Sequence, residues 1–347
     1  MNFSDELIIW YEDHKRDLPF RHTNNPYKIW LSEIILQQTK VDQGLPYYYK
    51  FIDKFPDITS LANADEDLVL KLWQGLGYYS RARNLHFSAK FIRDNYNGIF
   101  PDSYKQILSL KGVGLYTAAA ISSFAFNLPY SVVDGNVIRV LSRVFGISTE
   151  FDTNYGINEF RVLAQDLLPE NNHAIYNQAI MEFGALSCKP KKPLCSDCIF
   201  DSNCYALKND LVYKLPKKKN KIKVRDRFIH FLIINKNKKI YLSKNSEGVW
   251  TGLYQFPYLE LDKQYSNDDV EKSDAWSSFF QDFPYLITRV STAIKHKLSH
   301  QRLNVVFWHI TCDEIILDKF NLFDPKLISD LPVSRLTDKY LLVNSIN

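Results

Sequence analysis

The sequence predicts two domains, a long all-α part followed by a smaller α+β part. Apolar residues recur with helical spacing from the N-terminus to about residue 208. A segment rich in lysine and arginine comes next, and beyond it the pattern changes to that of strands. A length of 347 residues also suits two or three domains.

Composition and charge narrow the class of protein. The chain is 46% hydrophobic and 24% charged, as expected of a globular protein with substantial cores. Its net charge of +4 suits a polyanionic partner without requiring one. Since no run of about 18 apolar residues occurs, we expect no membrane-spanning segment. The N-terminus carries acidic residues and shows no signal-peptide pattern, so the cytoplasm is the expected compartment.

The first helices place a carboxyl group in apolar surroundings. A helix over 3–16 ends in a proline turn that carries Arg21, and an apolar helix over 27–36 carries Glu33. Glu33 either lies at the polar edge of its helix or is held for chemistry. If it is desolvated, its pKa rises and it can keep a proton near neutral pH.

Two segments after apolar helices could reach toward a ligand. Gln38 and Thr39 follow the helix that carries Glu33, and they either end that helix or extend into a partner. Further helices are expected over 45–73. The stretch Gly75-Leu76-Gly77-Tyr78 then makes a tight turn that presents an aromatic ring. Such a ring can wedge into or stack on bases, although a loop tyrosine that caps a core is the plainer interpretation.

The most informative stretch of the chain is 110–145. The turn Lys111-Gly112-Val113-Gly114 precedes a helix over 115–127, whose free N–H groups would favour an anion such as a phosphate. Asp134 precedes the next helix. Aspartate at that place is commonly only a helix cap, but its pairing with the glycine turn is harder to explain by packing alone.

Four of the five cysteines are clustered. Helices near 158–168 and 173–184 lead into the series Cys188-x6-Cys195-x2-Cys198-x5-Cys204, whereas Cys312 stands alone. In a cytoplasmic chain such clustering favours an inorganic centre over disulfides. Zinc is the first alternative, because structural zinc also takes four cysteines, but its sites usually present two close pairs and here only one pair is close.

The C-terminal part reads as strands with short helices. A hairpin is expected around residues 235–238, and the sequence of Leu298-Ser299-His300 is that of a polar turn before a strand. The expected strands cover 228–234, 239–244 and 302–311, and helical stretches are expected near 268–280 and 325–331.

Taken together, these segments resemble the MutY-type adenine DNA glycosylases of the helix–hairpin–helix, endonuclease III superfamily. The motifs are LSEIILQQT, GLGYYSRARNL, GVGLYTAAAI, VDGNVIRVLSR and the cysteine series. The resemblance spans nearly the whole chain. It implies an all-α helix–hairpin–helix glycosylase domain over 1–208 that includes an iron–sulfur loop at 188–204. A basic linker over 209–225 and an α+β Nudix-like domain over 226–347 would follow.

The resemblance also implies an activity. Such enzymes remove adenine mispaired with 8-oxoguanine, or with guanine, from duplex DNA, and we expect a monomer that carries a 4Fe–4S cluster on its four cysteines. Glu33 would be the general acid that protonates adenine N7, and Asp134 would stabilise the cationic sugar. Asn136 would position Asp134, and Tyr116 would hydrogen-bond into the same site.

Other positions match residues that contact DNA in this family. They are Arg21 and Gln178 for the adenine pocket; Gln38 and Tyr78 as wedges near 8-oxoguanine; Thr39 for the lesion strand; Ser299 and His300 for reading the lesion; and Lys111, Gly112, Val113 and Gly114 for the DNA backbone. Two positions depart from the family pattern, because Lys111 stands where proline is common and Phe20 where tryptophan is common.

Position 116 separates the main interpretation from its alternative. An endonuclease III-type glycosylase and lyase for oxidised pyrimidines would carry a Schiff-base lysine there and would lack the C-terminal domain. Tyr116 cannot form that adduct, so we expect a monofunctional glycosylase. A catalytically inactive DNA-binding protein is disfavoured because both acids are present. The glutamate-rich Nudix box is missing, so the C-terminal domain should recognise a lesion without hydrolysing nucleotides.

Overall fold

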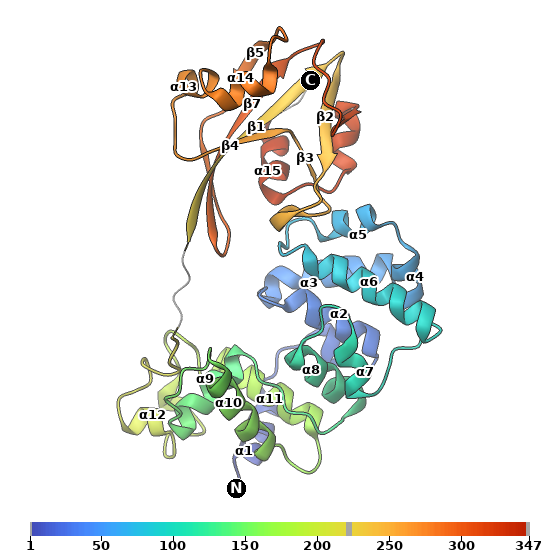
Figure 1. Cartoon of the computed structure of the whole chain (residues 1–347). Helices are drawn as coiled ribbons and strands as arrows, with labels where there is room; N and C mark the ends of the chain where they lie inside the picture. The colour runs from blue at the N-terminus through green and yellow to red at the C-terminus, as the bar shows by residue number, and fades with distance from the viewer. Residues whose placement is uncertain (1, 220–223, 345–347) are drawn as a thin grey trace. The chain divides into compact units, whose positions relative to one another are not determined.

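A computed structural model describes residues 2–219 and 224–344. The chain divides into two compact units, which are drawn in Figure 1. The first unit takes in Met1–Asn63 and Asn84–Lys221, and the second takes in Ala64–Arg83 and Ile222–Asn347. Each unit is described by itself below.

The described residues of the first unit form helices joined by loops. Its α-helices are α1 (Phe3–His14), α2 (Pro26–Leu36), α3 (Val41–Lys54), α4 (Ile58–Asn63), α6 (Ser80–Asn95, from Asn84 onward), α7 (Tyr104–Ser109), α8 (Leu115–Phe126), α9 (Gly135–Phe145), α10 (Asn154–Asp166), α11 (His173–Leu186) and α12 (Tyr205–Lys208). Two short 3-10 helices accompany them, η1 (Pro19–Arg21) and η2 (Cys195–Asp197).

Local sequence explains where the helices of the site begin. Asn25 precedes α2 and accepts hydrogen bonds from the backbone N–H groups of Tyr27 and Lys28, and Pro26 fits the first helical position because it lacks an N–H. Asp134 caps α9 in the same way. At the other end of α9, Gly146 adopts a left-handed conformation that stops the helix.

One core cluster of the first unit lies where α9 packs against α11. The apolar face of α9 has the spacing expected from the sequence, and it packs with aromatic and aliphatic residues of α11, α1 and the cysteine segment. These core residues include Leu7, Val137, Val140, Leu141, Ala179, Ile180, Phe183 and Phe200. Because both helices are fixed by this packing, the polar residues at their edges are held in defined positions.

The second unit combines a sheet with short helices. It contains α5 (Glu66–Trp73), β1 (Arg225–Lys236), β2 (Lys239–Lys244), η3 (Gly248–Trp250), β3 (Tyr254–Gln255), β4 (Tyr258–Leu261), α13 (Asn267–Glu271), α14 (Asp274–Phe280), β5 (Leu286–Val290), β6 (Ile294–Lys297), β7 (Gln301–Thr311), β8 (Asn321–Phe323), η4 (Pro325–Asp330) and α15 (Arg335–Val343).

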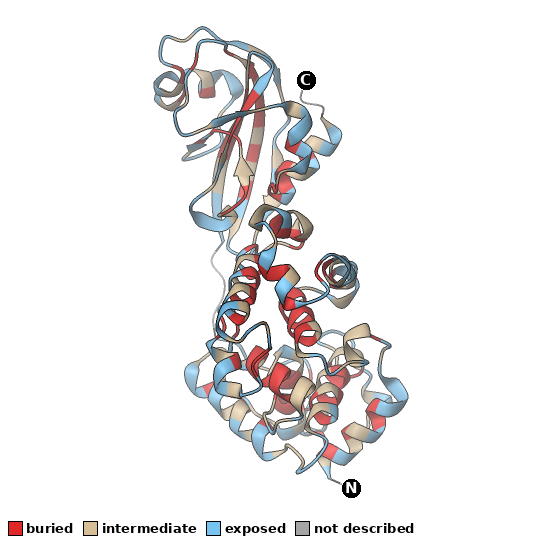
Figure 2. Ribbon diagram, turned by 90° about the vertical axis from the view of Figure 1, so that its right-hand side faces the viewer, coloured by how far each residue is buried: buried red, intermediate tan, exposed pale blue. Residues whose placement is uncertain are grey.

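Two parallel strands form the centre of the sheet. β1 pairs with β7 along its whole length, from Arg225 opposite Gln301 to Asn235 opposite Thr311. The other pairings are antiparallel, and the strand order is β3-β2-β1-β7-β5, with β4 on β1, β6 on β7 and β8 on β2. One sheet face packs against α15 and the other against α13 and α14. Buried positions follow the central strands in Figure 2.

Residues 64–83 belong to the second unit because specific polar contacts hold them there. Asp67 of α5 accepts from Lys244 Nζ at 2.6 Å. Gln74 Nε2 donates to Asp338 Oδ1 at 2.7 Å, and Gln74 Oε1 accepts from the backbone N–H of Val333 at 3.0 Å. The two structural units divide the chain differently from the domains predicted from the sequence. The predicted domain boundaries therefore stay predictions.

The fold class expected from the sequence is confirmed, a helical unit together with a mixed α+β unit. The predicted hairpin forms between β1 and β2, and the strand predicted at 302–311 is β7. Three details differ. The stretch near 268–280 is two helices, each begun by a serine cap; η4 is a 3-10 helix; and α15 with five short strands was not foreseen.

No helix in the described residues is both long and apolar enough to cross a bilayer.

Candidate active site

One cavity of the first unit gathers most of the residues singled out from its sequence. Its volume is about 550 Å³, and it lies between α2, α8, α9 and α11. Its lining includes Arg16, Phe20, Arg21, Glu33, Gln37, Gln38, Thr39, Tyr116, Asp134, Asn136, Gln178, Met181 and Glu182. Residues as far apart in the chain as Arg16 and Glu182 thus line the same cavity.

Glu33 is a buried acid with a hydroxyl partner. Its side chain projects from α2, and the residue is only 9% exposed. Tyr116 Oη, from α8, donates to Glu33 Oε2 at 2.9 Å. Burial raises the pKa of Glu33 from its ordinary 4.5 to about 7, while the bond from Tyr116 and the charge of Arg21 lower it in part. The carboxyl group is therefore poised to exchange a proton near neutral pH.

Asp134 is held as a helix cap by three N–H groups. Its Oδ1 accepts from the backbone N–H groups of Asn136 and Val137, both at 2.8 Å, and its Oδ2 accepts from Asn136 Nδ2 at 2.7 Å. Burial raises the pKa of Asp134, and these hydrogen bonds counter that rise. The N-terminus of α9 also favours the anion. The plain interpretation as a cap is thus correct, and the same carboxylate lines the cavity.

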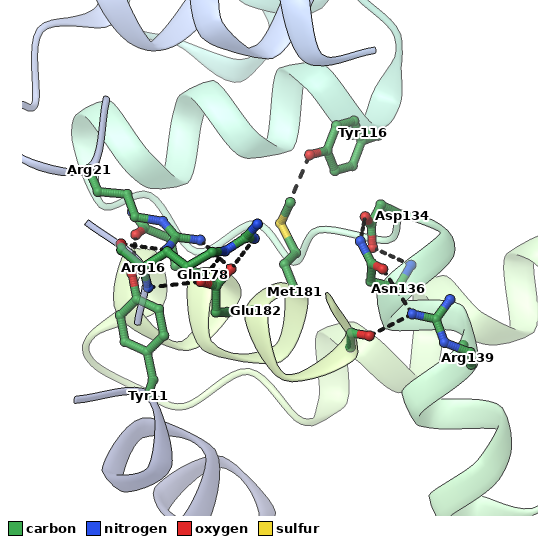
Figure 3. A network of polar contacts seen from close by, with 11 residues as sticks. Tyr11, Arg16, Arg21, Tyr116, Asp134, Asn136, Arg139, Gln178, Met181 and Glu182 are labelled. Atoms are coloured by element: carbon green, nitrogen blue, oxygen red, sulfur yellow. Dashed lines mark hydrogen bonds and ion pairs between the residues drawn. The ribbon is translucent and has the colours of Figure 1, made fainter. Parts of the chain in front are cut away.

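A third acid in the cavity, Glu182, differs from Glu33 in the direction of its pKa shift. Glu182 of α11 is only 1% exposed and accepts bidentate bonds from Arg16 at 2.6 and 2.8 Å and from Arg21 at 2.7 and 2.9 Å. Burial would raise its pKa, but the two guanidinium groups hold the pKa at about 2. Nearby, Tyr11 Oη donates to Gln178 Oε1 at 2.6 Å. Figure 3 shows this group of side chains.

Arginines of α9 connect the cap to the cysteine segment. Arg139 Nη2 donates to Asn136 Oδ1 at 2.9 Å (Figure 3). The same Nη2 donates to the carbonyl of Gly184 at 2.7 Å, and Nε donates to the carbonyl of Cys188 at 2.7 Å. One turn further, Arg143 Nη1 donates to the carbonyl of Lys189 at 2.8 Å. The orientation of Asn136, and through it that of Asp134, therefore depends on how the cysteine segment is folded.

The four clustered cysteines all line one small cavity next to Arg143 and Leu207. Their thiols are free, and N–H groups point at two of the sulfurs: Arg143 Nη1 at 3.4 Å from Cys188 Sγ, and the backbone N–H of Phe200 at 3.4 Å from Cys198 Sγ. Within the described ranges, no three histidine, cysteine or acidic side chains converge as a single metal ion requires. Donors around a larger inorganic cluster would be further apart than around zinc.

The glycine turn before α8 has an open outer surface. Gly112 has a φ of +84° and lies so close to Asn84 that a Cβ would come within 2.8 Å of it, whereas a Cβ at Gly114 would meet nothing within 4 Å. The carbonyl of Lys111 accepts from Ser88 Oγ at 3.0 Å. No side chain caps α8, so its first N–H groups face the open side.

In the second unit, the structure brings Tyr78 and Ser299 together. Tyr78 Oη and Ser299 Oγ are hydrogen-bonded, although 221 positions separate them. Tyr78 is 46% exposed and has a φ of +47°. His300 lies in the same turn between β6 and β7, where its carbonyl accepts from the backbone N–H of Arg225. A left-handed backbone at a non-glycine residue is strained, and such strain often marks a functional position.

The cavity also holds residues that the sequence analysis did not single out. The lining includes Arg16, Glu182 and Met181. Arg139 contacts the lining residue Asn136 by donating a hydrogen bond to its side chain. Glu182 had a signal that could have been followed, because it is an acid inside an apolar helical stretch just as Glu33 is. Arg16 and Arg139 had none, since a lone arginine on a helix is usually solvated.

Comparison with known proteins places the chain in the class of base-excision DNA glycosylases. The family described as "HhH-GPD superfamily base excision DNA repair protein" matches residues 31–161. A solved thermostable thymine-DNA glycosylase superposes with a TM-score of 0.56 and 32% identity over 60% of this chain and 95% of its own. An endonuclease III–DNA complex, at a TM-score of 0.53 and 22% identity over 60% of this chain and 94% of its own, shares the fold.

A relative that spans nearly the whole chain narrows this class. The adenine DNA glycosylase of Buchnera aphidicola subsp. Baizongia pistaciae is 35% identical over 331 residues, which cover 92% of this chain and 88% of that protein. The chain therefore belongs to the adenine DNA glycosylase family.

The pKa of Glu33 leads to a prediction about stability. Glu33→Gln should stabilise the protein by about 2 to 3 kcal/mol more at pH 8 than at pH 5. The folded-state pKa of about 7 exceeds the ordinary value of 4.5, so the native carboxyl group opposes folding increasingly as the pH rises through this range. The neutral amide lacks this penalty. Urea unfolding of both proteins at the two pH values measures the difference.

Glu182→Gln is the matched control with the opposite sign. Because the pKa of Glu182 is lowered to about 2, its contribution to stability is already complete above pH 4.5. Its loss should destabilise the protein by a similar amount at pH 5 and at pH 8. Parallel pH profiles for the native protein and Glu33→Gln would contradict the prediction.

Proposed function

We propose that this enzyme hydrolyses the N-glycosidic bond of adenine placed opposite 8-oxoguanine, or opposite guanine, in duplex DNA. Family membership supports the class of reaction and the adenine base. One observation carries the assignment of residues: Glu33 and Asp134 line the same cavity but have different partners. Glu33 accepts from one hydroxyl group, whereas Asp134 accepts from three N–H groups. The adenine must leave the base stack to enter it.

Glu33 would supply the proton. With a pKa near 7, its carboxyl group is partly protonated at neutral pH and can pass its proton to N7 of adenine. Protonation turns the base into a neutral leaving group, and the resulting carboxylate can then accept a proton from the attacking water. Tyr116 would orient Glu33 through the hydrogen bond that it donates.

Asp134 would stabilise the positive charge that develops on the sugar. Three N–H donors and the start of α9 keep this carboxylate anionic and fix its direction. A carboxylate held before the reaction needs no reorganisation when the cation forms. This division of labour between a protonated and an ionised acid is the general solution for glycosidic bonds.

The side chain at position 116 favours hydrolysis alone. A glycosylase that also cleaves the strand needs an amine to form a Schiff base, and Tyr116 has none. We therefore propose a monofunctional enzyme. The alternative, an endonuclease III-type glycosylase and lyase for oxidised pyrimidines, is disfavoured by this residue and by the sheet unit that follows the helical one.

DNA contacts are proposed for both units. The open turn Lys111–Gly114 would hold a backbone phosphate. Gln38, Thr39 and Tyr78 would enter the duplex near 8-oxoguanine, and Arg21 and Gln178 would line the adenine pocket. Ser299, with His300 in the same turn, would recognise the lesion, and the hydrogen bond between Ser299 and Tyr78 would connect this residue to the proposed wedge.

We expect a monomer that works on DNA in the cytoplasm, with domains as predicted at 1–208, 209–225 and 226–347.

We also propose that Cys188, Cys195, Cys198 and Cys204 hold a 4Fe–4S cluster. Their shared cavity and the N–H groups directed at sulfur suit thiolate ligands of such a cluster. When bound, the cluster would cross-link the segment, with no chemical role in base removal. Two arginines of α9 contact this segment: Arg139 donates to the carbonyl of Cys188 and Arg143 to that of Lys189. Arg139 also donates to Asn136, the residue that bonds to Asp134.

Adenine release tests the proposed acid. The native protein should release free adenine from a duplex with adenine opposite 8-oxoguanine and should leave the strand uncut until alkali is added. Glu33→Gln should slow the release by about 10² to 10⁴-fold, because general acid catalysis is lost. Single-turnover kinetics with chromatographic detection of adenine measure both rates.

Glu12→Gln provides the control for that experiment, since Glu12 is an exposed acid on α1 that pairs with Lys15. It should keep the native rate. A Glu33→Gln enzyme as fast as the native one, or strand cleavage that keeps pace with base release, would overturn the assignment.

Lesion reading is tested at Ser299. Ser299→Ala should weaken binding to adenine opposite 8-oxoguanine by about tenfold, as for one lost hydrogen bond, and should leave binding to adenine opposite guanine nearly unchanged. Ser329→Ala, whose hydroxyl bonds within its own 3-10 turn, should change neither affinity. Equal losses with both duplexes would show that Ser299 does not read the lesion.

Chemical determination of iron and sulfide in the purified protein tests the cluster proposal. Purified protein should contain about four iron and four sulfide per chain, and Cys195→Ser should lower both. Cys312→Ser is the matched control, because Cys312 is buried in the core of the second unit, whereas the four clustered cysteines belong to the first. Zinc in place of iron, or equal loss in both variants, would contradict a cluster on these four ligands.

A further inference from the structure

A second cavity, of about 480 Å³, lies in the sheet unit on the face covered by α13 and α14. Alternate residues of the central strands point to this face. Leu232, Ile234, Trp308 and Ile310 are covered by Trp276 and Phe280 of α14. Further along the same strands the paired residues Phe228 and Asn304, then His230 and Val306, line the cavity instead.

His230 directs an unused donor toward this cavity. The residue is only 5% exposed. Trp308 Nε1 donates to His230 Nδ1 at 3.1 Å, which leaves the proton of the neutral ring on Nε2. Burial lowers the pKa of His230 to about 4, so the ring stays neutral at physiological pH. Among the described residues His230 Nε2 has no hydrogen-bond partner. Nε2 is not one of the fully inaccessible unpartnered atoms, so its N–H group is open to a molecule in the cavity.

The rest of the lining is polar but uncharged. Asn304 of β7, Asn267 at the start of α13 and Thr292 of the β5–β6 loop line the cavity. Their side chains have no partners within the part of the chain that the structure describes. Phe228 and Tyr265 add aromatic rings. None of the described lining residues is charged, so the cavity offers no compensating charge to a phosphate group.

From these features we propose that this cavity binds a neutral purine base or nucleoside. Amide side chains donate and accept along the edge of a base, and aromatic rings contact its faces. The cavity volume falls in the range of small-molecule sites. The Nε2–H group of His230 would donate to a ring nitrogen or carbonyl oxygen. This site lies in the other unit from the catalytic cavity, and the inference does not rest on the proposed adenine chemistry.

The test is titration of the full-length protein with guanosine and adenosine by calorimetry. Saturable binding of at least one is expected, with the 5′-monophosphate no tighter than the nucleoside. Asn304→Leu should weaken binding about tenfold, as one hydrogen bond is lost, and Asn267→Ala should weaken it independently. Asn321→Leu, on strand β8 outside the cavity, should leave binding unchanged.

Several outcomes separate this site from the catalytic one. Binding that persists in Glu33→Gln and falls in Asn304→Leu supports the proposal. No binding of either nucleoside, equal losses in Asn304→Leu and Asn321→Leu, or loss in Glu33→Gln alone would overturn it. Thermal unfolding midpoints verify that each variant is folded. Displacement of guanosine by DNA would identify a DNA base as the source of the ligand, and simultaneous binding would identify a free nucleoside.

Discussion

The cap that Asp134 makes on α9 is the constraint on which the active site depends. A carboxylate that accepts three N–H bonds has one orientation, so the direction of the negative charge is set by backbone geometry. The helix that it caps has its apolar face in the core and its arginines on the cysteine segment. Gly184 completes this arrangement, because a Cβ there would come within 2.6 Å of Asn136 Cβ. Close helix packing thus positions a charge.

Burial alone does not decide what an acid can do in this cavity. Glu33 and Glu182 are both almost inaccessible to water, yet the pKa of the first is about 7 and that of the second about 2. The difference is in their partners: one neutral hydroxyl donates to Glu33, whereas two guanidinium groups surround Glu182. Glu182 can hold arginines at the cavity wall but cannot donate a proton, and Glu33 can exchange its proton but forms no ion pair.

Sequence patterns predicted elements well where local rules govern them. The spacing of apolar residues predicted α9 and its core face, and the hairpin of β1 and β2 followed from alternation and turn residues. The patterns failed where a distant partner decides the structure. Strands as short as β5 and β6 exist because β7 pairs with them, and Gln74 joins the sheet unit through Asp338 and Val333. No local signal reports such partners.

Backbone conformation was the other feature hidden from sequence reasoning, and it concerns the proposed wedge residues. Gln38 and Tyr78 have φ values of +54° and +47°, a region that side chains other than those of glycine and asparagine seldom adopt. Such a conformation costs of order 1 kcal/mol or more and persists only where the surrounding contacts impose it. For Tyr78 the contacts are visible: Trp73 Nε1 and Arg81 Nη2 both donate to the carbonyl of Gly77. Other residues of the chain share this conformation. At Gln38 and Tyr78, however, it coincides with the positions that the resemblance assigns to the duplex, and a turn fixed before binding suits a side chain that must enter the base stack.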